Sequence, residues 1–195
     1  RAFSAGALAI IAAVLVGMQL PVTPVQILWV NMITAATLGL ALAFEPPSGE
    51  VMQRRPRPPN EPIVSARLLG RIVLVALVML AGTFGFYGLL RGSGVPLDVA
   101  RTAAVNALVL FEAAYLLSAR LLERRLRHWR DFMGNGAVWK SIATVLVLQL
   151  VFTYAPWFQM FMGSAAMPAW YWVVLIPLAL VVVPIVELEK RLLER

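Results

Sequence analysis

The fold is decided by one stretch, Leu20–Pro47, which reads LPVTPVQILWVNMITAATLGLALAFEPP. Prolines near its start predict a corner, and the long apolar run that follows predicts a helix. Asn31 and Thr34 lie three residues apart in that run, so they share one face of the helix near its middle. The Glu-Pro-Pro sequence at 45–47 ends the helix, because proline cannot continue it. We expect any chemistry of the chain to involve this helix.

The composition places the chain in a membrane. Hydrophobic residues make up 61% of the 195 residues and charged residues 14%, whereas a soluble domain has about 45–50% apolar and about 25% charged residues. A globule of this size could not bury the excess. The sequence therefore predicts an all-α integral membrane protein that crosses the lipid bilayer several times.

Six apolar runs approach the length of about 20 residues that a membrane-spanning helix needs. They predict six transmembrane helices in a single unit over residues 1–195. The predicted spans are 4–19, 25–44, 68–90, 99–122, 138–154 and 171–188.

The charges predict the orientation. Of the 17 Lys and Arg residues, all but Arg91 and Arg101 fall on one side of the predicted membrane. Because cytoplasmic loops carry the excess of basic residues, both termini are expected in the cytoplasm. Trp157, Trp170 and Trp172 flank the uncharged loop before the last span, where they are expected to anchor the chain at the lipid headgroups.

The composition argues against several classes of function. The chain has no cysteine, which excludes disulfides and thiolate metal sites, and its single histidine, His128, lies in a basic run. The net charge of +7 sits beside helix ends rather than in a separate basic domain, so no nucleic-acid partner is expected. We find no phosphate-cradling glycine-rich loop and no nucleophile constellation, and expect no cofactor in this chain.

Glu112 is the clearest ionisable group inside a predicted span. It lies near the middle of VNALVLFEAAYLL, and a carboxylate in the membrane is costly unless it is paired or solvated. One interpretation is a functional group that faces a cavity. The other is a protonated carboxyl that hydrogen-bonds to a neighbouring helix.

Asn31 and Thr34 allow two interpretations as well. Amide and hydroxyl oxygens are hard ligands that suit Ca²⁺, Mg²⁺ or alkali cations. The same side chains also serve as hydrogen-bonding links between membrane helices. The residues alone leave both open, and for Gln149 in the fifth span we favour the link.

The loop at 45–67 differs from the other connections because it is rich in proline and has no apolar periodicity. It is expected to be extended rather than helical. Either it is a solvated cytoplasmic connector, or it docks on a partner, as loops of this length often do.

Four segments together carry a resemblance to a known family: PVTPVQILWVN, MIT, LGLALAFEPP and MQRRPRPPNEPI. They resemble the C-terminal transport region of P-type cation-transporting ATPases, with the calcium-pump type and its bacterial relatives closest. AVNALVLFEAAYLL resembles the eighth helix of that family, though less specifically. The resemblance covers essentially the whole chain and implies that the six spans correspond to the fifth to tenth transmembrane helices.

The resemblance implies roles for particular residues. Asn31 and Thr34 match the Asn and Thr of the family's Asn-x-x-Thr-Asp cation motif, and Glu112 falls where calcium pumps place a cation-binding Glu. The proline-rich loop resembles one that couples phosphorylation to ion movement. Its candidate coupling residues are Arg55, Pro58, Asn60 and Glu61.

Three positions depart from the family pattern. Ala35 replaces the Asp of the motif, and Phe3 and Gly6 stand where the preceding helix should carry Asn and Glu. A divalent cation usually wants several anionic oxygens, and Glu112 alone remains among the matched positions. A monovalent ion, a proton or a degenerate site therefore fits better than a calcium site.

The resemblance implies a function for the whole. The chain is expected to be the membrane-transport portion of a pump in a bacterial plasma membrane, with a transported cation as its ligand. Mg-ATP would be used by cytoplasmic domains outside this chain, so the chain is not expected to be an enzyme by itself. Its opening, Arg1-Ala2-Phe3 directly before an apolar run, favours a piece of a longer protein. The alternatives are a degenerate, non-enzymatic scaffold or accessory protein and, less well supported, a small secondary transporter, because the halves show no self-similarity.

Overall fold

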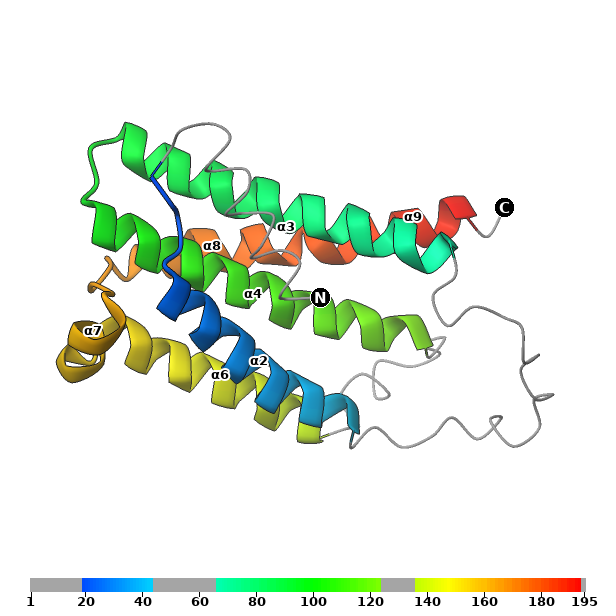
Figure 1. Cartoon of the computed structure of the whole chain (residues 1–195). Coiled ribbons are helices and arrows are strands. Elements are labelled where there is room, and N and C mark those ends of the chain that lie inside the picture. The colour runs from blue at the N-terminus through cyan, green and yellow to red at the C-terminus, as the bar shows by residue number, and fades with distance from the viewer. Residues whose placement is uncertain (1–18, 44–65, 124–135, 194–195) are drawn as a thin grey trace.

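The structure, a computed structural model, describes residues 19–43, 66–123 and 136–193. Every regular element within these ranges is an α-helix (Figure 1). The helices are α2 (Pro24–Ala43), α3 (Ala66–Gly92), α4 (Leu97–Glu123), α6 (Gly136–Tyr154), α7 (Pro156–Met162), α8 (Trp170–Leu180) and α9 (Val182–Leu193).

The helices follow the predicted apolar runs closely. Four of the predicted spans, at 25–44, 68–90, 99–122 and 138–154, coincide with α2, α3, α4 and α6 to within about two residues at each end. The last predicted span is divided into α8 and α9. The first one, at 4–19, lies almost wholly outside the described residues, so the count of six membrane spans stays a prediction.

The chain is an integral membrane protein by the length and composition of its helices. Three helical stretches are long and apolar enough to cross a bilayer: Leu69–Gly92, Leu97–Ser118 and Trp170–Glu189. The pair formed by α6 and α7 qualifies only when taken together, and it is bent by 83°. At 20 residues, α2 also has the length that a span needs.

Thr23 and Gln26 fix the start of α2. The Gln26 backbone N–H donates to the Thr23 hydroxyl at 3.3 Å, and the Thr23 N–H donates to Gln26 Oε1 at 3.0 Å. These reciprocal bonds form a capping box, with Pro24 at the first helical position, where its missing N–H costs nothing. The sequence T-P-V-Q therefore sets both the start and the direction of the helix.

A tight turn makes α3 and α4 antiparallel neighbours. The N–H of Val95 donates to the Leu90 carbonyl at 3.0 Å, and the N–H of Gly94 donates to the Arg91 carbonyl at 3.1 Å. This is a Schellman motif, and Gly94 takes the left-handed conformation that it requires, with φ of 78°. The Arg91 guanidinium closes the turn by donating to the Val95 carbonyl at 2.7 Å.

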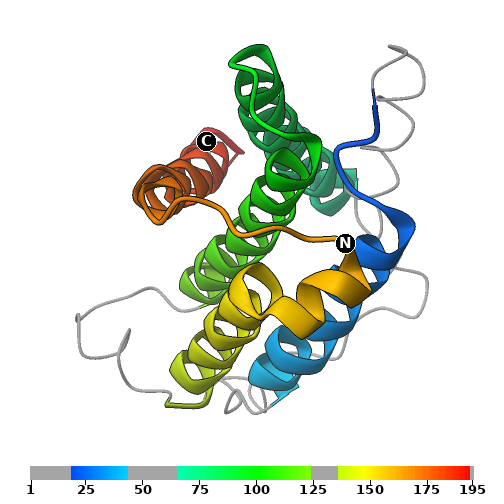
Figure 2. The same cartoon turned by 90° about the vertical axis from the view of Figure 1, so that its left-hand side faces the viewer.

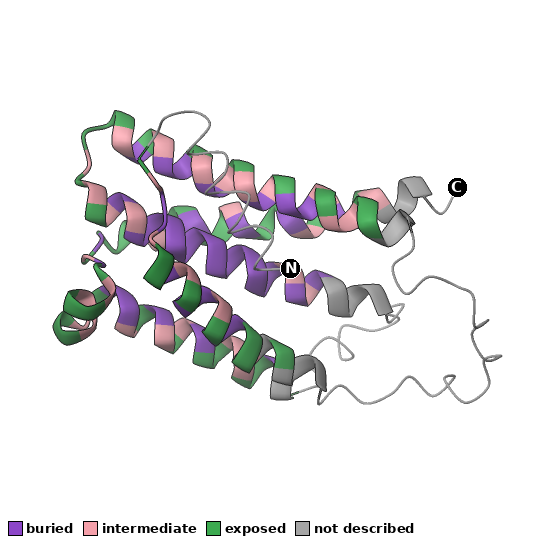
Figure 3. Cartoon of the chain, viewed as in Figure 1, coloured by how far each residue is buried: buried purple, intermediate pink, exposed green. Residues whose placement is uncertain are grey.

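Helix α4 lies at the centre of the bundle and packs against α2, α3, α6, α8 and α9 (Figures 1 and 2). In an apolar window of 18 residues, 83% of the α4 residues are buried, against 33% in the corresponding window of α3 and 28% in that of Trp170–Glu189 (Figure 3). Six buried alanines allow the neighbours to approach closely. They are Ala100, Ala103, Ala104, Ala107, Ala113 and Ala114.

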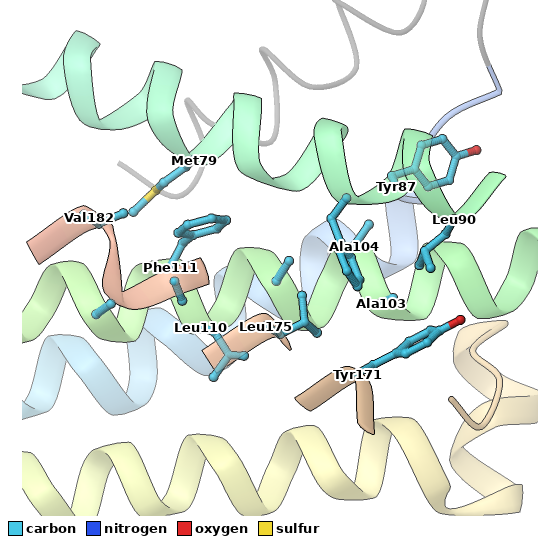
Figure 4. Packing of buried hydrophobic residues seen from close by; sticks show 14 of the residues in the cluster. Met79, Tyr87, Leu90, Ala103, Ala104, Leu110, Phe111, Tyr171, Leu175 and Val182 are labelled. Atoms are coloured by element: carbon cyan, nitrogen blue, oxygen red, sulfur yellow. The ribbon is translucent and has the colours of Figure 1, made fainter. Parts of the chain in front are cut away.

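Phe111 of α4 anchors the packing of α3 and α9 on the central helix (Figure 4). Its ring is 1% exposed and belongs to the same buried cluster as Met79 and Val182. On the α3 side, it lies so close to Gly82 that a Cβ added there would be 2.7 Å from Phe111 Cε2. Glycine is therefore needed at position 82 for close approach of α3 and α4.

The last predicted span is interrupted at Val181, between α8 and α9. Pro177 lies inside α8 and Pro184 inside the first turn of α9, and each removes a backbone donor from the helix. The far end of α9 is tied to α3 by an ion pair, in which Arg71 Nε donates to Glu189 Oε2 at 2.8 Å.

Candidate cation site

Two of the predicted site residues come together where α2 packs against α4. Thr34 of α2 is 6% exposed and Glu112 of α4 is 8% exposed. The Thr34 side chain lies beside the Glu112 carboxyl. The structure thus joins a hydroxyl and a carboxyl from helices that are 78 positions apart in the chain.

The Glu112 carboxyl keeps its acceptor capacity free within the described part of the chain. Neither of its oxygens has a hydrogen-bond partner there, because the Thr34 hydroxyl donates instead to the Val30 carbonyl at 2.8 Å. A buried carboxyl without partners is costly for folding. Such a cost is typical of a group retained for what it binds, whether a cation or a proton.

Asn31 lies one helical turn from Thr34, on the same side of α2, and is half-buried. Ala35, where the family motif has Asp, is exposed on α2. The methyl group there supplies no oxygen ligand.

Glu112 is the one acidic side chain among the candidate site residues that the structure describes. Among the residues that the structure describes, no group of three or more His, Cys, Asp or Glu side chains could hold a metal ion. One carboxyl, one hydroxyl and one neighbouring amide are hard ligands with a single formal charge between them.

The other candidate residues cannot be placed. Arg55, Pro58, Asn60 and Glu61 of the proline-rich loop lie outside the described residues, and so do Phe3 and Gly6. Their roles stay predictions.

A buried polar network, which was not predicted as a unit, joins three helices of the bundle. Trp29 Nε1 of α2 donates to Gln149 Oε1 of α6 at 3.1 Å, and Gln149 Nε2 donates to Asn106 Oδ1 of α4 at 2.9 Å. Asn106 Nδ2 then donates to the Thr153 hydroxyl at 2.9 Å. Gln149 thus links helices, as predicted. The sequence feature that could have revealed the other members of the network is the presence of Asn106 and Thr153 in otherwise apolar runs.

Replacing Gln149 with Leu is expected to lower the stability of the protein. The change leaves the Trp29 indole N–H and the Asn106 amide oxygen buried without partners, at a cost of about 1–3 kcal/mol for each unsatisfied group. Hydrogen bonds between membrane helices average only about 0.6 kcal/mol in measured cases, so the lower end of this range is expected.

The melting temperature in detergent measures the effect, with Gln19→Leu as the matched control because Gln19 is exposed. Equal melting temperatures for the two variants would mean that the network contributes nothing to stability.

These features define a class of protein: an integral membrane bundle, built round one buried helix, with a carboxyl and a hydroxyl meeting between two helices. The family described as "Cation transporting ATPase, C-terminus" matches residues 19–192. The chain belongs to this family, as the resemblance in its sequence predicted.

Individual relatives agree with the family. "Probable cation-transporting ATPase F" of Mycobacterium tuberculosis is 36% identical over 186 residues, which cover 95% of this chain and 20% of that protein. "Cation-transporting ATPase pma1" of Synechocystis sp. is 34% identical, over 94% of this chain and 21% of that protein. "Calcium-transporting ATPase" of Bacillus subtilis is 29% identical over 80% of this chain and 18% of its own length. The chain spans about a fifth of the length of these relatives.

Proposed function

We propose that the chain forms the membrane-transport portion of a P-type ATPase that moves cations across a membrane. The observation that carries the proposal is the buried Glu112 carboxyl, which has no hydrogen-bond partner among the described residues and lies beside Thr34. In a chain of this family, a costly carboxyl between two helices is best explained as a group that takes up and releases the transported ion.

Energy for this transport comes, in the proposal, from ATP hydrolysis in cytoplasmic domains that lie outside residues 1–195. Mg-ATP is bound by those domains and not by this chain. Arg55, Pro58, Asn60 and Glu61 transmit phosphorylation to the membrane helices through the proline-rich loop. The other partners of the chain in this proposal are the remaining helices of the same pump and the surrounding lipid.

We place the protein in a bacterial plasma membrane, since its relatives include mycobacterial and cyanobacterial proteins. Both termini lie in the cytoplasm, by the distribution of Lys and Arg. The end of the bundle that carries the α3–α4 turn and α7 is then the outer end.

The transported ion is a proton or a monovalent cation in this proposal. Ala35 removes the carboxylate of the family motif, and Glu112 supplies one negative charge where a calcium site uses several. A relative of this chain is named as a calcium transporter, so the ion needs a direct measurement.

The test is the ATPase activity of the full-length protein in lipid vesicles, measured with Ca²⁺, Mn²⁺, Na⁺ and K⁺ and over a range of pH. We expect stimulation by Na⁺ or K⁺, or a dependence on pH alone, and no stimulation by submicromolar Ca²⁺. High-affinity stimulation by Ca²⁺ would overturn the choice of ion.

A second function is favoured by one observation, the loss of the motif carboxylate at Ala35. A degenerate relative could persist as a non-enzymatic scaffold or accessory membrane protein. The same assay separates the two functions, because a scaffold has no ATPase activity that responds to any ion or to pH.

A further inference from the structure

The short helix α7 leaves the bundle at a sharp angle. It is bent by 83° from α6, begins at Pro156 and ends at Met162, and it is capped by Gly163, whose φ of 62° is left-handed. The N–H groups of Gly163 and Ser164 both donate to the Gln159 carbonyl, at 2.8 and 3.3 Å, which closes the helix after two turns. Proline before it and glycine after it therefore make α7 a defined element rather than a loop.

The two sides of α7 differ. Phe158 and Met162 pack on the buried cluster formed by α2, α4 and α6. The opposite side presents Trp157, Met160 and Phe161, which are 68%, 89% and 75% exposed. Their spacing at i, i+3 and i+4 puts them on one face of the helix. Here the apolar side points away from the protein, which is the reverse of a helix that meets water.

The stretch of chain that contains this face carries no charge. The sequence contains no Asp, Glu, Lys or Arg between Lys140 and Glu187. Trp170 is 59% exposed and lies at the start of α8, which begins at the same end of the bundle as α7 (Figure 1). Aromatic and aliphatic side chains without charge favour the boundary between lipid headgroups and acyl chains over water.

The direction of α7 fits that boundary. If α6 crosses the bilayer within the usual tilt of about 20°, a helix bent by 83° from it runs nearly parallel to the membrane plane. Figure 1 shows α7 at the end of the bundle that also holds the α3–α4 turn and the start of α2. If the long helices cross the bilayer, this end is where they leave the hydrocarbon region.

The inner side of α7 is bonded to α2. The fully buried Gln26 donates through Nε2 to the carbonyls of Met162 and Gly163, at 3.2 and 3.3 Å. The ring of Phe158 meets Trp29 edge-on, with centroids 4.8 Å apart. Because Gln26 is also part of the capping box of α2, the first turn of α2 and the end of α7 are held as one piece.

We propose that α7 is a membrane-interface helix, with Trp157, Met160 and Phe161 inserted among the lipid headgroups and upper acyl chains, and that it holds the first turn of α2 at a set depth. The partner is the lipid surface itself, and the uncharged face makes the insertion independent of lipid charge. The proposal concerns membrane depth and does not depend on which ion, if any, is transported.

Site-directed spin labelling tests the proposal. Because residues 1–195 contain no cysteine, Met160→Cys introduces one label site in this region of the full-length protein, with any cysteines elsewhere replaced. Accessibility to oxygen and to a water-soluble nickel chelate is measured in phosphatidylcholine vesicles. Leu77→Cys on the exposed side of α3 and Ser93→Cys in the exposed turn serve as the lipid and water references.

The label at position 160 is expected to be severalfold more accessible to oxygen than to the nickel chelate, at a depth between the two references. Phe161→Cys should behave in the same way, and adding phosphatidylglycerol should leave both depths unchanged. Nickel accessibility equal to that at position 93 would place α7 in water. Shielding from both reagents would mean that a protein partner covers it. Either result, or a depth that requires phosphatidylglycerol, overturns the proposal.

Gln26→Leu tests the connection to α2. The variant removes the donor to Met162 and Gly163, so the spin label at position 160 is expected to become more mobile. Gln19→Leu, which changes an exposed glutamine at the same end of the bundle, should leave the label mobility unchanged. Equal mobility in the two variants would show that α7 is not held by α2. These readouts use neither ATP nor a transported ion, so they can fail independently of the proposed transport.

Discussion

Replacing Glu112 with Gln in the full-length protein is expected to lower its ion- or pH-dependent ATPase activity by about tenfold or more, since even outer-shell changes at metal sites cost about 10–100-fold. The amide keeps the size of the side chain and removes its charge and its ability to take up a proton. Because the carboxyl has no other partner among the described residues, the change breaks no internal hydrogen bond there.

Stability separates a functional role of Glu112 from a structural one. Removing an unpaired buried carboxyl relieves a desolvation cost, so the Gln variant is expected to melt at the same temperature as the parent or higher. Thr83→Val is the matched control, because Thr83 of α3 is also buried with no partner for its hydroxyl among the described residues. It should leave the ATPase activity unchanged. Full activity in Glu112→Gln would mean that the carboxyl is not part of the transport site.

The fold was predictable where local chemistry decides it. The apolar runs predicted four helices to within about two residues at each end, because length and hydrophobicity decide them. The corner before α2 followed from Pro24, although the Thr23–Gln26 capping box was missed. Helix α7 was also missed, since a two-turn helix is too short for periodicity to reveal; Pro156 and Gly163 were its only signals.

The candidate site was predictable only in part. Glu112 and Thr34 could be named as polar groups in apolar runs, and the structure brings them together. The periodicity of apolar residues does not predict which helices pack together, because every apolar face is equally suited to lipid and to a neighbouring helix. The joining of Asn106, Gln149 and Trp29 into one network therefore needed the structure.

Gly82→Ala is expected to destabilise the protein, even though alanine normally favours a helix over glycine by about 0.5–1 kcal/mol. The added methyl group would lie 2.7 Å from Phe111 Cε2. The ring is 1% exposed and held by its neighbours, so it cannot move aside without repacking. Overpacking of this kind costs about 1–3 kcal/mol, which exceeds the gain in helix propensity.

Two other glycines of α3 provide matched controls with the opposite sign. A Cβ at Gly85 or Gly88 meets nothing within 4 Å, so Gly85→Ala and Gly88→Ala are expected to raise the melting temperature in detergent while Gly82→Ala lowers it. Phe111→Leu combined with Gly82→Ala should recover part of the loss, because the smaller side chain makes room for the methyl group. If all three alanine variants shift the melting temperature in the same direction, the conclusion that close packing of α3 on α4 requires glycine at position 82 is wrong.

The same variant connects packing with transport, because Phe111 directly precedes Glu112 on α4. A methyl group at position 82 pushes on the Phe111 ring, and the repacking reaches the helix turn that carries the carboxyl. Gly82→Ala is therefore expected to lower the ATPase activity as well as the melting temperature, whereas Glu112→Gln lowers the activity alone. If Gly82→Ala lowers the melting temperature but keeps full ATPase activity, α4 holds Glu112 in place without the support of α3.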